Sequence, residues 1–155
     1  MNDSMSNFAC AETDSPHLVA PGQRPRSTIA PTLVLEDGEH RVVIGLPIGA
    51  RIPTVMLQVL QDRMTFGRVL TDAIGDTRVH FDPGWRQGEL DAINAEQYHD
   101  PLVVAGLREA GREVELVEVA GTGRHFGGVN AVEIHLDGLL TGYADPRRSN
   151  EAVGF

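Results

Sequence analysis

Lysine is absent from this chain of 155 residues, because all 13 of its basic residues are arginines. Its absence excludes chemistry that needs a lysine amine, such as a Schiff base or a lysine general base. The single cysteine, Cys10, excludes an internal disulfide and cannot complete a cysteine-based zinc site. The fold must therefore be held by noncovalent packing, and the cysteine count leaves the cellular compartment open.

Long apolar runs and basic clusters are also missing. No run approaches the roughly 20 apolar residues that span a bilayer, and the N-terminus has neither a basic start nor an apolar stretch. The net charge of −9 repels phosphate backbones, and no group of basic residues offsets it locally. We expect no membrane span, no signal within the chain and no nucleic-acid partner, and the localisation stays open.

The histidines and glycines form no recognisable metal or nucleotide motif. No HxH or HxxxH pair occurs among His17, His40, His80, His99, His125 and His135. GTGRHFGG at 121–128 fits neither the P-loop nor the G-x-G-x-x-G spacing, so it is interpreted as a glycine-rich connection between strands. Cys10 and His17 form a nucleophilic pair only if they meet in space, and a bystander thiol is the default. No metal and no cofactor are predicted.

Length and composition indicate one partial or complete domain over 1–155, with an ordinary apolar content of 41% and charged content of 23%. Four prolines within the first 31 residues favour extended and turn conformations, which predicts an irregular, packed loop. The next segment, Thr32 to Leu46, has two β-branched runs around Asp37-Gly38, which predicts a β-hairpin.

Helical periodicity follows the hairpin. Apolar residues at helical spacing predict a helix from Ile52 to Met64, a shorter one from Arg68 to Ile74, and one from Asp100-Pro101 to Gly111. The remaining strands are predicted at Glu113–Val119, Val129–Leu136 and Leu139–Ala144. Because the helices fall between hairpin-like groups, the pattern favours a layered α+β fold over a regular parallel βαβ fold.

Three sequence blocks carry a family resemblance. They are GQRPRSTIAPTLVLEDG at 22–38, GLPIGARIPTVMLQVL at 45–60 and GYADPRRSNEAVGF at 142–155, and MNDSMSNF at the start adds a weaker match. In order and spacing they resemble the C-terminal part of the small subunit of γ-glutamyltranspeptidases, whose blocks have the form RPxSSMxPTxVxxDG, GSPGGSRI and ADPRRxGxAxGY. The similarity extends over nearly the whole chain.

The resemblance implies an Ntn-hydrolase-like αββα sandwich, incomplete in this chain. In that family a precursor cuts itself and exposes an N-terminal threonine, which attacks a γ-glutamyl amide such as that of glutathione, with its own amine as general base. The threonine is expected before the position that matches Met1, and no Gly-x-Ser-x-Gly elbow replaces it. The chain alone is therefore expected to be inactive, with the large subunit and the N-terminal part of the small subunit as partners.

The first block supplies the expected carboxylate contacts. In the family, two consecutive serines hydrogen-bond the substrate's α-carboxylate, and the matching residues here are Ser27 and Thr28, which keep both hydroxyls. The alternative is that these residues only close a loop between prolines. The 1–31 segment is accordingly expected to be an irregular loop on the substrate side.

The second block is expected to form the oxyanion hole. A strand, a glycine-containing turn and a helix start direct unpaired backbone N–H groups toward one point. The family uses two glycines here, and the matching residues are Ile48 and Gly49. A backbone donor tolerates the change to isoleucine, but isoleucine does not share the positive φ open to glycine. A plain strand-to-helix turn is the alternative.

The N-terminal segment departs most from the family. Asn7 stands where an aspartate pairs with the substrate's α-ammonium, and Ser4 stands where a longer amide is usual. Loss of the ion pair weakens selection for an α-amino acid. Cephalosporin-acylase-like relatives act on acyl groups without that ammonium, so a similar substrate is one alternative.

Two functions from different classes follow. The first is a γ-glutamyl transferase or hydrolase part that binds a γ-glutamyl or related carboxylate substrate. The second is a non-catalytic remnant or small-carboxylate-binding module. Asp145-Pro146-Arg147-Arg148 is expected to tie the C-terminus to the sheet through salt bridges, and an unpaired sheet edge is expected to favour self-association.

Overall fold

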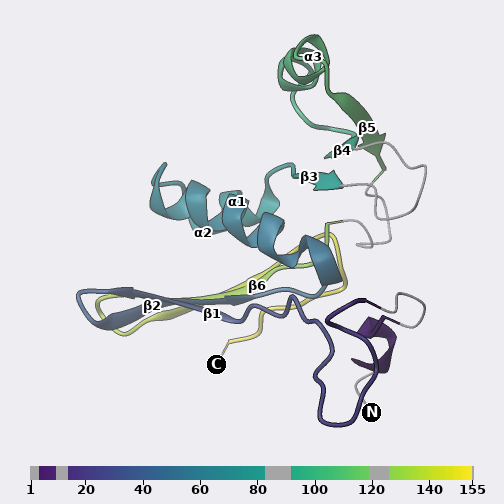
Figure 1. The fold of residues 1–155 in the computed structure, drawn as a ribbon. Helices are drawn as coiled ribbons and strands as arrows, with labels where there is room; N and C mark the ends of the chain where they lie inside the picture. Colours follow the sequence, from purple (N-terminus) through teal and green to yellow (C-terminus); the bar gives the residue numbers. More distant parts are fainter. Residues whose placement is uncertain (1–3, 10–13, 83–91, 119–125, 155) are drawn as a thin grey trace.

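The larger of two sheets is antiparallel and has the strand order β1-β2-β6-β7 in the computed structural model, which describes residues 4–9, 14–82, 92–118 and 126–154 (Figure 1). Its strands are β1 Thr32–Glu36, β2 Glu39–Gly45, β6 Asn130–Ile134 and β7 Leu140–Ala144. The predicted hairpin is confirmed, with Asp37 and Gly38 both at positive φ in the turn between β1 and β2. The strands β6 and β7 are shorter than predicted at their ends.

Two helices, α1 Ile52–Met64 and α2 Leu70–Gly75, lie over one face of this sheet (Figure 1). α1 has the predicted bounds, and its apolar stripe is buried at Ile52, Val55, Met56 and Val59, whereas Met64 at its end is exposed. α2 begins two residues later than predicted, since Val69 is still extended. The core between helices and sheet contains Val42, Ile44, Val55, Met56, Val59, Leu70, Ala73, Ile74, Val129 and Ala131.

A smaller sheet has the order β3-β4-β5 and lies beyond the helices (Figure 1). Its elements are β3 Val79–Asp82, β4 Ala92–Glu96, α3 Pro101–Glu109 and β5 Glu113–Val117. The predicted helix after Asp100 is confirmed, and the Asp100 carboxylate caps it by accepting the N–H of Leu102 at 2.8 Å. β4 and β5 pair in parallel across α3, so one βαβ unit exists within the α+β fold.

The face of the larger sheet that turns away from the helices carries an apolar row. Leu33, Val43 and Val132 are neighbours across β1, β2 and β6, and their side chains are 58%, 42% and 37% exposed. Alternation along the strands puts these residues opposite the helix-facing core. An apolar sheet face of this kind is what a second sheet packs against in a sandwich, and among the described residues this face stays exposed.

The segment before β1 is irregular, as predicted, but the prediction that it packs is wrong for its described residues. It contains the short 3₁₀ helix η1 (Ser4–Asn7) and an isolated bridge between Ala9 and Leu18. Val19 is 51% exposed and Ile29 80% exposed. Prolines keep this stretch extended, and its apolar residues are too scattered to form a core. No helix of the described residues is long and apolar enough to cross a bilayer.

Candidate active site

The turn between β2 and α1 has the predicted strand–turn–helix form. Pro47 and Ile48 lead into a 3₁₀ turn, η2 Gly49–Arg51, which continues directly into α1. Gly49 has a φ of 63°, the left-handed conformation that glycine adopts without strain. Neither the Ile48 nor the Arg51 side chain caps the N–H groups that begin this helical run. These N–H groups also lie at the positive end of the helix dipole.

A hydrogen bond joins the first block to this turn. The Thr28 Oγ1 hydroxyl donates to the carbonyl of Gly49 at 2.6 Å, across 21 residues of sequence. The same carbonyl accepts the N–H of Ile52, so two donors hold its direction. The predicted residues Thr28 and Gly49 are therefore brought together in space.

Ser27 and Thr28 differ in how their hydroxyls are used. The Thr28 hydroxyl donates its proton to the Gly49 carbonyl, whereas Ser27 Oγ accepts the N–H of Ile29 at 3.2 Å. Within the described residues no acceptor takes the Ser27 proton, and Ser27 is exposed. A hydroxyl that accepts from the backbone still has its own proton to give to a carboxylate. Ser27 can therefore still donate a hydrogen bond to a ligand while Thr28 cannot, a difference that the sequence did not indicate.

Ser4 and Asn7 lie at the two ends of η1, a separate element from the turn. Asn7 is exposed and Ser4 is half-buried. Figure 1 shows the N-terminal segment at the same end of the molecule as the start of α1. The hydrogen bond from Thr28 thus unites the first and second blocks, while the N-terminal segment keeps its own local structure.

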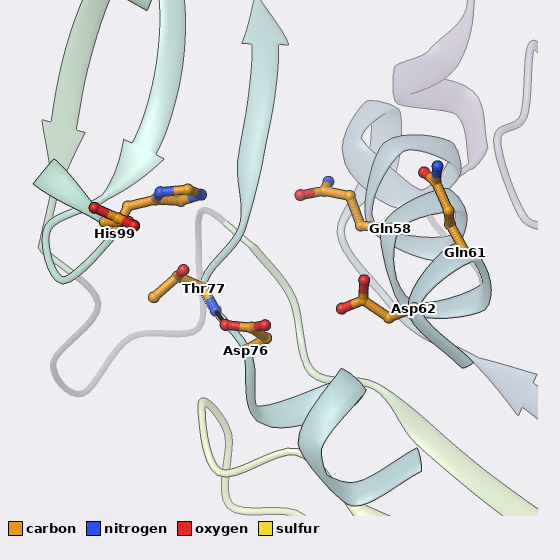
Figure 2. A pocket seen from close by; sticks show the side chains of 7 residues that line it. Gln58, Gln61, Asp62, Asp76, Thr77 and His99 are labelled. Atoms are coloured by element: carbon orange, nitrogen blue, oxygen red, sulfur yellow. Dashed lines mark hydrogen bonds between the residues drawn. The ribbon is translucent and has the colours of Figure 1, made fainter. Parts of the chain in front are cut away.

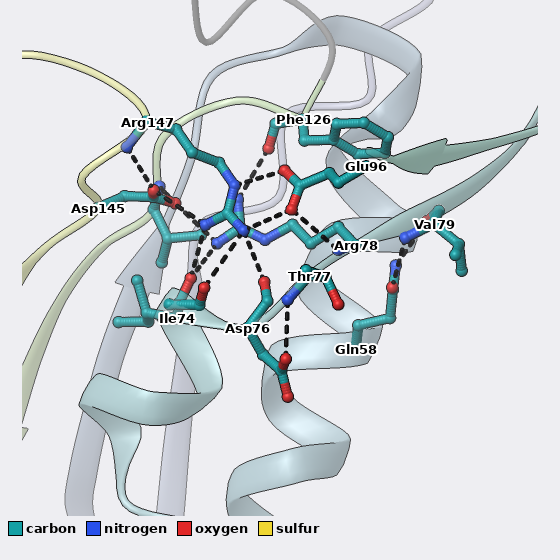
Figure 3. Close-up of polar contacts among 12 residues, drawn as sticks. Gln58, Ile74, Asp76, Thr77, Arg78, Val79, Glu96, Phe126, Asp145 and Arg147 are labelled. Carbon is teal, nitrogen blue, oxygen red and sulfur yellow. Dashed lines mark hydrogen bonds and ion pairs between the residues drawn. The ribbon is translucent and has the colours of Figure 1, made fainter. Parts of the chain in front are cut away.

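A buried ion-pair network connects the C-terminal block to both sheets (Figure 3). Arg78 Nη2 lies 2.7 Å from Asp145 Oδ2, and Arg147 Nε lies 2.6 Å from Glu96 Oε1. Asp145 follows β7, whereas Arg78 precedes β3 and Glu96 ends β4. The salt bridges expected for the ADPRR block are confirmed, and their partners are Glu96 in the smaller sheet and Arg78 just before that sheet's first strand.

Burial and charge act in opposite directions on this network. Burial alone would raise the pKa of Asp145, but the charge of Arg78 and the N–H groups of Val129 and Arg147 outweigh it, so the pKa lies below its usual range. Burial, followed by repulsion from Arg147, lowers the pKa of the Arg78 guanidinium. Two arginines and two carboxylates balance in charge, as buried ions must.

A polar hollow of about 380 Å³ lies elsewhere, between α1 and the smaller sheet (Figure 2). Its lining residues are Gln58, Gln61, Asp62, Asp76, Thr77, His99 and Asp100. Arg68 pairs with both Asp62 and Asp76, and this pairing lowers the pKa of Asp76. The predicted site residues do not line the hollow. With two of its carboxylates already neutralised, the hollow is a polar gap between packed elements.

Among the described residues, no three His, Cys, Asp or Glu side chains gather closely enough to hold a metal ion. Cys10 lies outside the described residues, so its pairing with His17 stays untested. Sequence reasoning missed Arg78 and Glu96 as partners of the C-terminal block. The one sequence signal that could have indicated these partners is the charge of the block Asp145-Pro146-Arg147-Arg148, whose ions need oppositely charged side chains elsewhere in the chain if they are buried.

Comparison with known proteins identifies the class of fold and then the family. The chain superposes on γ-glutamyltranspeptidase from Pseudomonas nitroreducens in complex with L-DON with a TM-score of 0.79 and 26% identity, covering 100% of this chain and 80% of that one. Its fold is therefore that of the Ntn hydrolases, an α+β sandwich.

The sequence model described as Gamma-glutamyltranspeptidase matches residues 1–155. The glutathione hydrolase proenzyme of Escherichia coli K12 is 32% identical over 129 residues, which are 83% of this chain and 20% of that protein. The acylase ACY 1 proenzyme of Pseudomonas sp. SE83 is 30% identical over 140 residues, 88% of this chain and 22% of that protein. The chain belongs to the γ-glutamyltranspeptidase family, and it spans about a fifth of the length of these two proenzymes.

Proposed function

We propose that this chain forms the substrate-binding and oxyanion part of a γ-glutamyl transferase or hydrolase. The substrate is a γ-glutamyl amide such as glutathione. An N-terminal threonine, supplied outside these 155 residues, attacks the amide and forms the acyl-enzyme. In the carboxylate-binding pair Ser27 and Thr28, Ser27 donates to the α-carboxylate while Thr28 holds the loop against the turn, with Ser4 and Asn7 alongside. The Ile48 and Gly49 N–H groups stabilise the oxyanion.

The observation that carries the proposal is the hydrogen bond from Thr28 to the Gly49 carbonyl at 2.6 Å. It supports a single site, because it holds the carboxylate-binding loop against the turn that offers the N–H groups. The exposed Ser27 hydroxyl beside it has a proton to donate. Donors for a carboxylate and donors for an oxyanion are both needed to hold a γ-glutamyl group with its amide carbon at the nucleophile.

The proposal predicts turnover only from an assembly. The chain is co-expressed with a partner that supplies the large subunit and the threonine-bearing segment, and cleavage of a γ-glutamyl anilide is followed. A matched partner with the threonine replaced by alanine serves as the control. We expect cleavage from the complete assembly and none from the control or the isolated chain. A correctly assembled complex without turnover of any anilide would contradict the proposal.

A second candidate is an acylase that acts on amides lacking the α-ammonium. It is favoured by Asn7, which cannot form an ion pair with an ammonium group, and by the similarity to the acylase from Pseudomonas. The same assembly decides between the two if it is given glutaryl anilide, which lacks the amino group. Faster cleavage of γ-glutamyl anilide supports the first candidate, and faster cleavage of glutaryl anilide supports the second.

A binding module without catalysis makes a different prediction. In that case the complete assembly cleaves neither anilide, yet glutamate or glutathione still binds, as measured by calorimetry. Absence of both cleavage and binding indicates a remnant. The γ-glutamyl enzyme, the acylase, the binding module and the remnant therefore differ from one another in at least one measured quantity.

The isolated chain is also expected to self-associate. Leu33, Val43 and Val132 leave apolar area on the outer sheet face, and β1 and β7 are edge strands of their sheet. Sedimentation velocity at increasing concentration should show oligomers. Val43→Glu should shift the distribution toward monomer, because it puts a charge in the middle of this row, whereas Leu57→Glu on the exposed side of α1 should not. A clean monomer at every concentration would refute this expectation.

A further inference from the structure

Gly127 packs closely against Pro47 and Ile48, in the turn that supplies the candidate oxyanion N–H groups. A Cβ atom on Gly127 would stand 2.5 Å from the carbonyl oxygen of Pro47 and 3.1 to 3.2 Å from side-chain atoms of Ile48. The first distance is shorter than any real contact, and its partner is backbone, which has little freedom to move away. Gly127 also has a φ of 69°, so both space and conformation require glycine here.

The contact acts on one particular peptide unit. The Pro47 carbonyl and the Ile48 N–H belong to the same planar trans peptide and point in opposite directions. Any tilt forced on the carbonyl therefore moves the Ile48 N–H by the same rotation. Gly127 limits this peptide from its carbonyl side.

The neighbouring peptide on the other side is held as well. The Gly49 carbonyl accepts from Thr28 Oγ1 at 2.6 Å, and this fixes the peptide between Gly49 and Ala50. The Ile48–Gly49 peptide, which carries the Gly49 N–H, lies between these two constrained units. The candidate oxyanion N–H groups of Ile48 and Gly49 are thus restrained from both sides. Gly127 restrains the Pro47–Ile48 peptide, and Thr28 restrains the Gly49–Ala50 peptide.

Gly127 is in turn anchored by the buried ion-pair network (Figure 3). Arg78 Nη1 donates to the Phe126 carbonyl at 2.9 Å, and the Val129 N–H donates to Asp145 Oδ2 at 2.9 Å. Phe126 and Val129 are fully buried on either side of the glycine pair. Hydrogen bonds to Phe126 and Val129 therefore hold the short segment 126–129 in place at both of its ends.

We propose that Gly127 is a positioning residue, which sets the direction of the Ile48 N–H by packing against the Pro47 carbonyl. This inference rests on the proposed function for its catalytic consequence, because it concerns the oxyanion turn. The packing itself is independent of that function. Gly127 touches no substrate and acts only through the Pro47–Ile48 peptide.

The test compares three alanine variants in the complete assembly. Gly127→Ala introduces the contact. Gly138→Ala has the same kind of positive φ, 85°, with no atom near its added Cβ, and so controls for backbone strain. Gly128→Ala adds crowding next door, but against the side chains of Arg148 and Asn150 at 2.9 Å, and so controls for local packing.

Gly127→Ala should lower kcat for γ-glutamyl anilide by roughly tenfold to a hundredfold, because misplacing an oxyanion donor affects the transition state. KM should change by less than about threefold, since the carboxylate contacts stay in place. The ¹⁵N and ¹H shifts of the Ile48 and Gly49 amides should move in this variant and not in the two controls. Equal loss of kcat in the controls, or unchanged amide shifts in Gly127→Ala, would overturn the inference.

A measurement on the unsubstituted assembly covers the case in which Gly127→Ala fails to fold. With isoleucine methyl labelling, a nuclear Overhauser effect is expected between the Gly127 Hα protons and the Ile48 methyl groups. Its absence overturns the inference. If the effect and the amide shifts appear in an assembly that cleaves no anilide, the positioning of the turn is supported and the proposed function alone has failed.

Discussion

Asp145→Ala is expected to lower the free energy of unfolding by about 3–5 kcal/mol, because it breaks a buried pair and leaves a buried charge without its partner. Asp145 has no exposed surface, and Arg78 is 1% exposed. The carboxylate also accepts the Val129 N–H at 2.9 Å, so alanine leaves a second buried donor unpaired. The expected loss is a large part of the stability of a domain of this size.

Chemical denaturation followed by circular dichroism measures this change. Glu36→Ala is the matched control, because it removes a carboxylate that pairs with Arg41 at 3.5 Å while 73% exposed. An exposed pair of this kind contributes about 0–1 kcal/mol. If Asp145→Ala and Glu36→Ala lower the free energy of unfolding by similar amounts, the buried ion-pair network in Figure 3 does not stabilise the fold more than an exposed pair does.

The same carboxylate predicts a pH dependence. Its pKa in the folded chain lies below the ordinary value of about 3.9, so the unfolded chain binds the proton more readily. The stability from Asp145 is thus fully present above that ordinary value and is lost as pH falls through the lower, folded pKa. Unfolding free energies measured between neutral pH and about pH 3 should fall less steeply in Asp145→Asn than in the unsubstituted chain. Identical slopes would show that other carboxylates dominate.

The double replacement Ser27→Ala and Thr28→Ala is expected to raise KM for a γ-glutamyl anilide about a hundredfold in the assembly, since a hydrogen bond to a charged group contributes about 1.5–3 kcal/mol. Ser27 has a proton to donate to the carboxylate, whereas the Thr28 proton is engaged by the Gly49 carbonyl at 2.6 Å. The single variants should therefore differ. Ser27→Ala should act mainly on KM, and Thr28→Ala should also lower kcat, because it releases the oxyanion turn.

Ser15→Ala is the control for this pair of variants. Ser15 Oγ accepts the N–H of His17 at 3.2 Å, the same local bond and distance that Ser27 makes with Ile29. It therefore reproduces the loss of a loop hydrogen bond without touching the candidate site. A double variant whose KM stays within about threefold of the unsubstituted assembly would remove Ser27 and Thr28 from the carboxylate contacts.

Local patterns account for the elements that were predicted well. Asp37-Gly38 specifies a tight turn by itself, and the flanking β-branched runs need only pair with each other to form β1 and β2. α1 follows from apolar spacing, with Pro53 suited to its first turn. Asp100 likewise caps α3 through a contact two residues away. Each of these signals is contained in a short, continuous stretch of sequence.

The elements that were missed depend on distant partners. AINAE in β4 has no alternating apolar pattern, because its last three residues are all buried in a strand that lies between β3 and β5. Arg78 would be expected at a surface from its side chain alone, yet it is buried where Asp145 meets it across 67 residues. The prediction that the first 31 residues pack failed for the opposite reason, since no core of the described residues reaches them.

The sequence by itself determined the family, the order of strands and helices around α1, and the residue types at the candidate site, because these depend on block order and local periodicity. The tertiary structure decided how these residues are used. It engaged the Thr28 proton with Gly49, left the Ser27 proton to donate, and placed Gly127 against Pro47. The physical reason is that these hydrogen bonds and close backbone contacts form between segments far apart in the chain. A local sequence pattern cannot predict contacts of that kind.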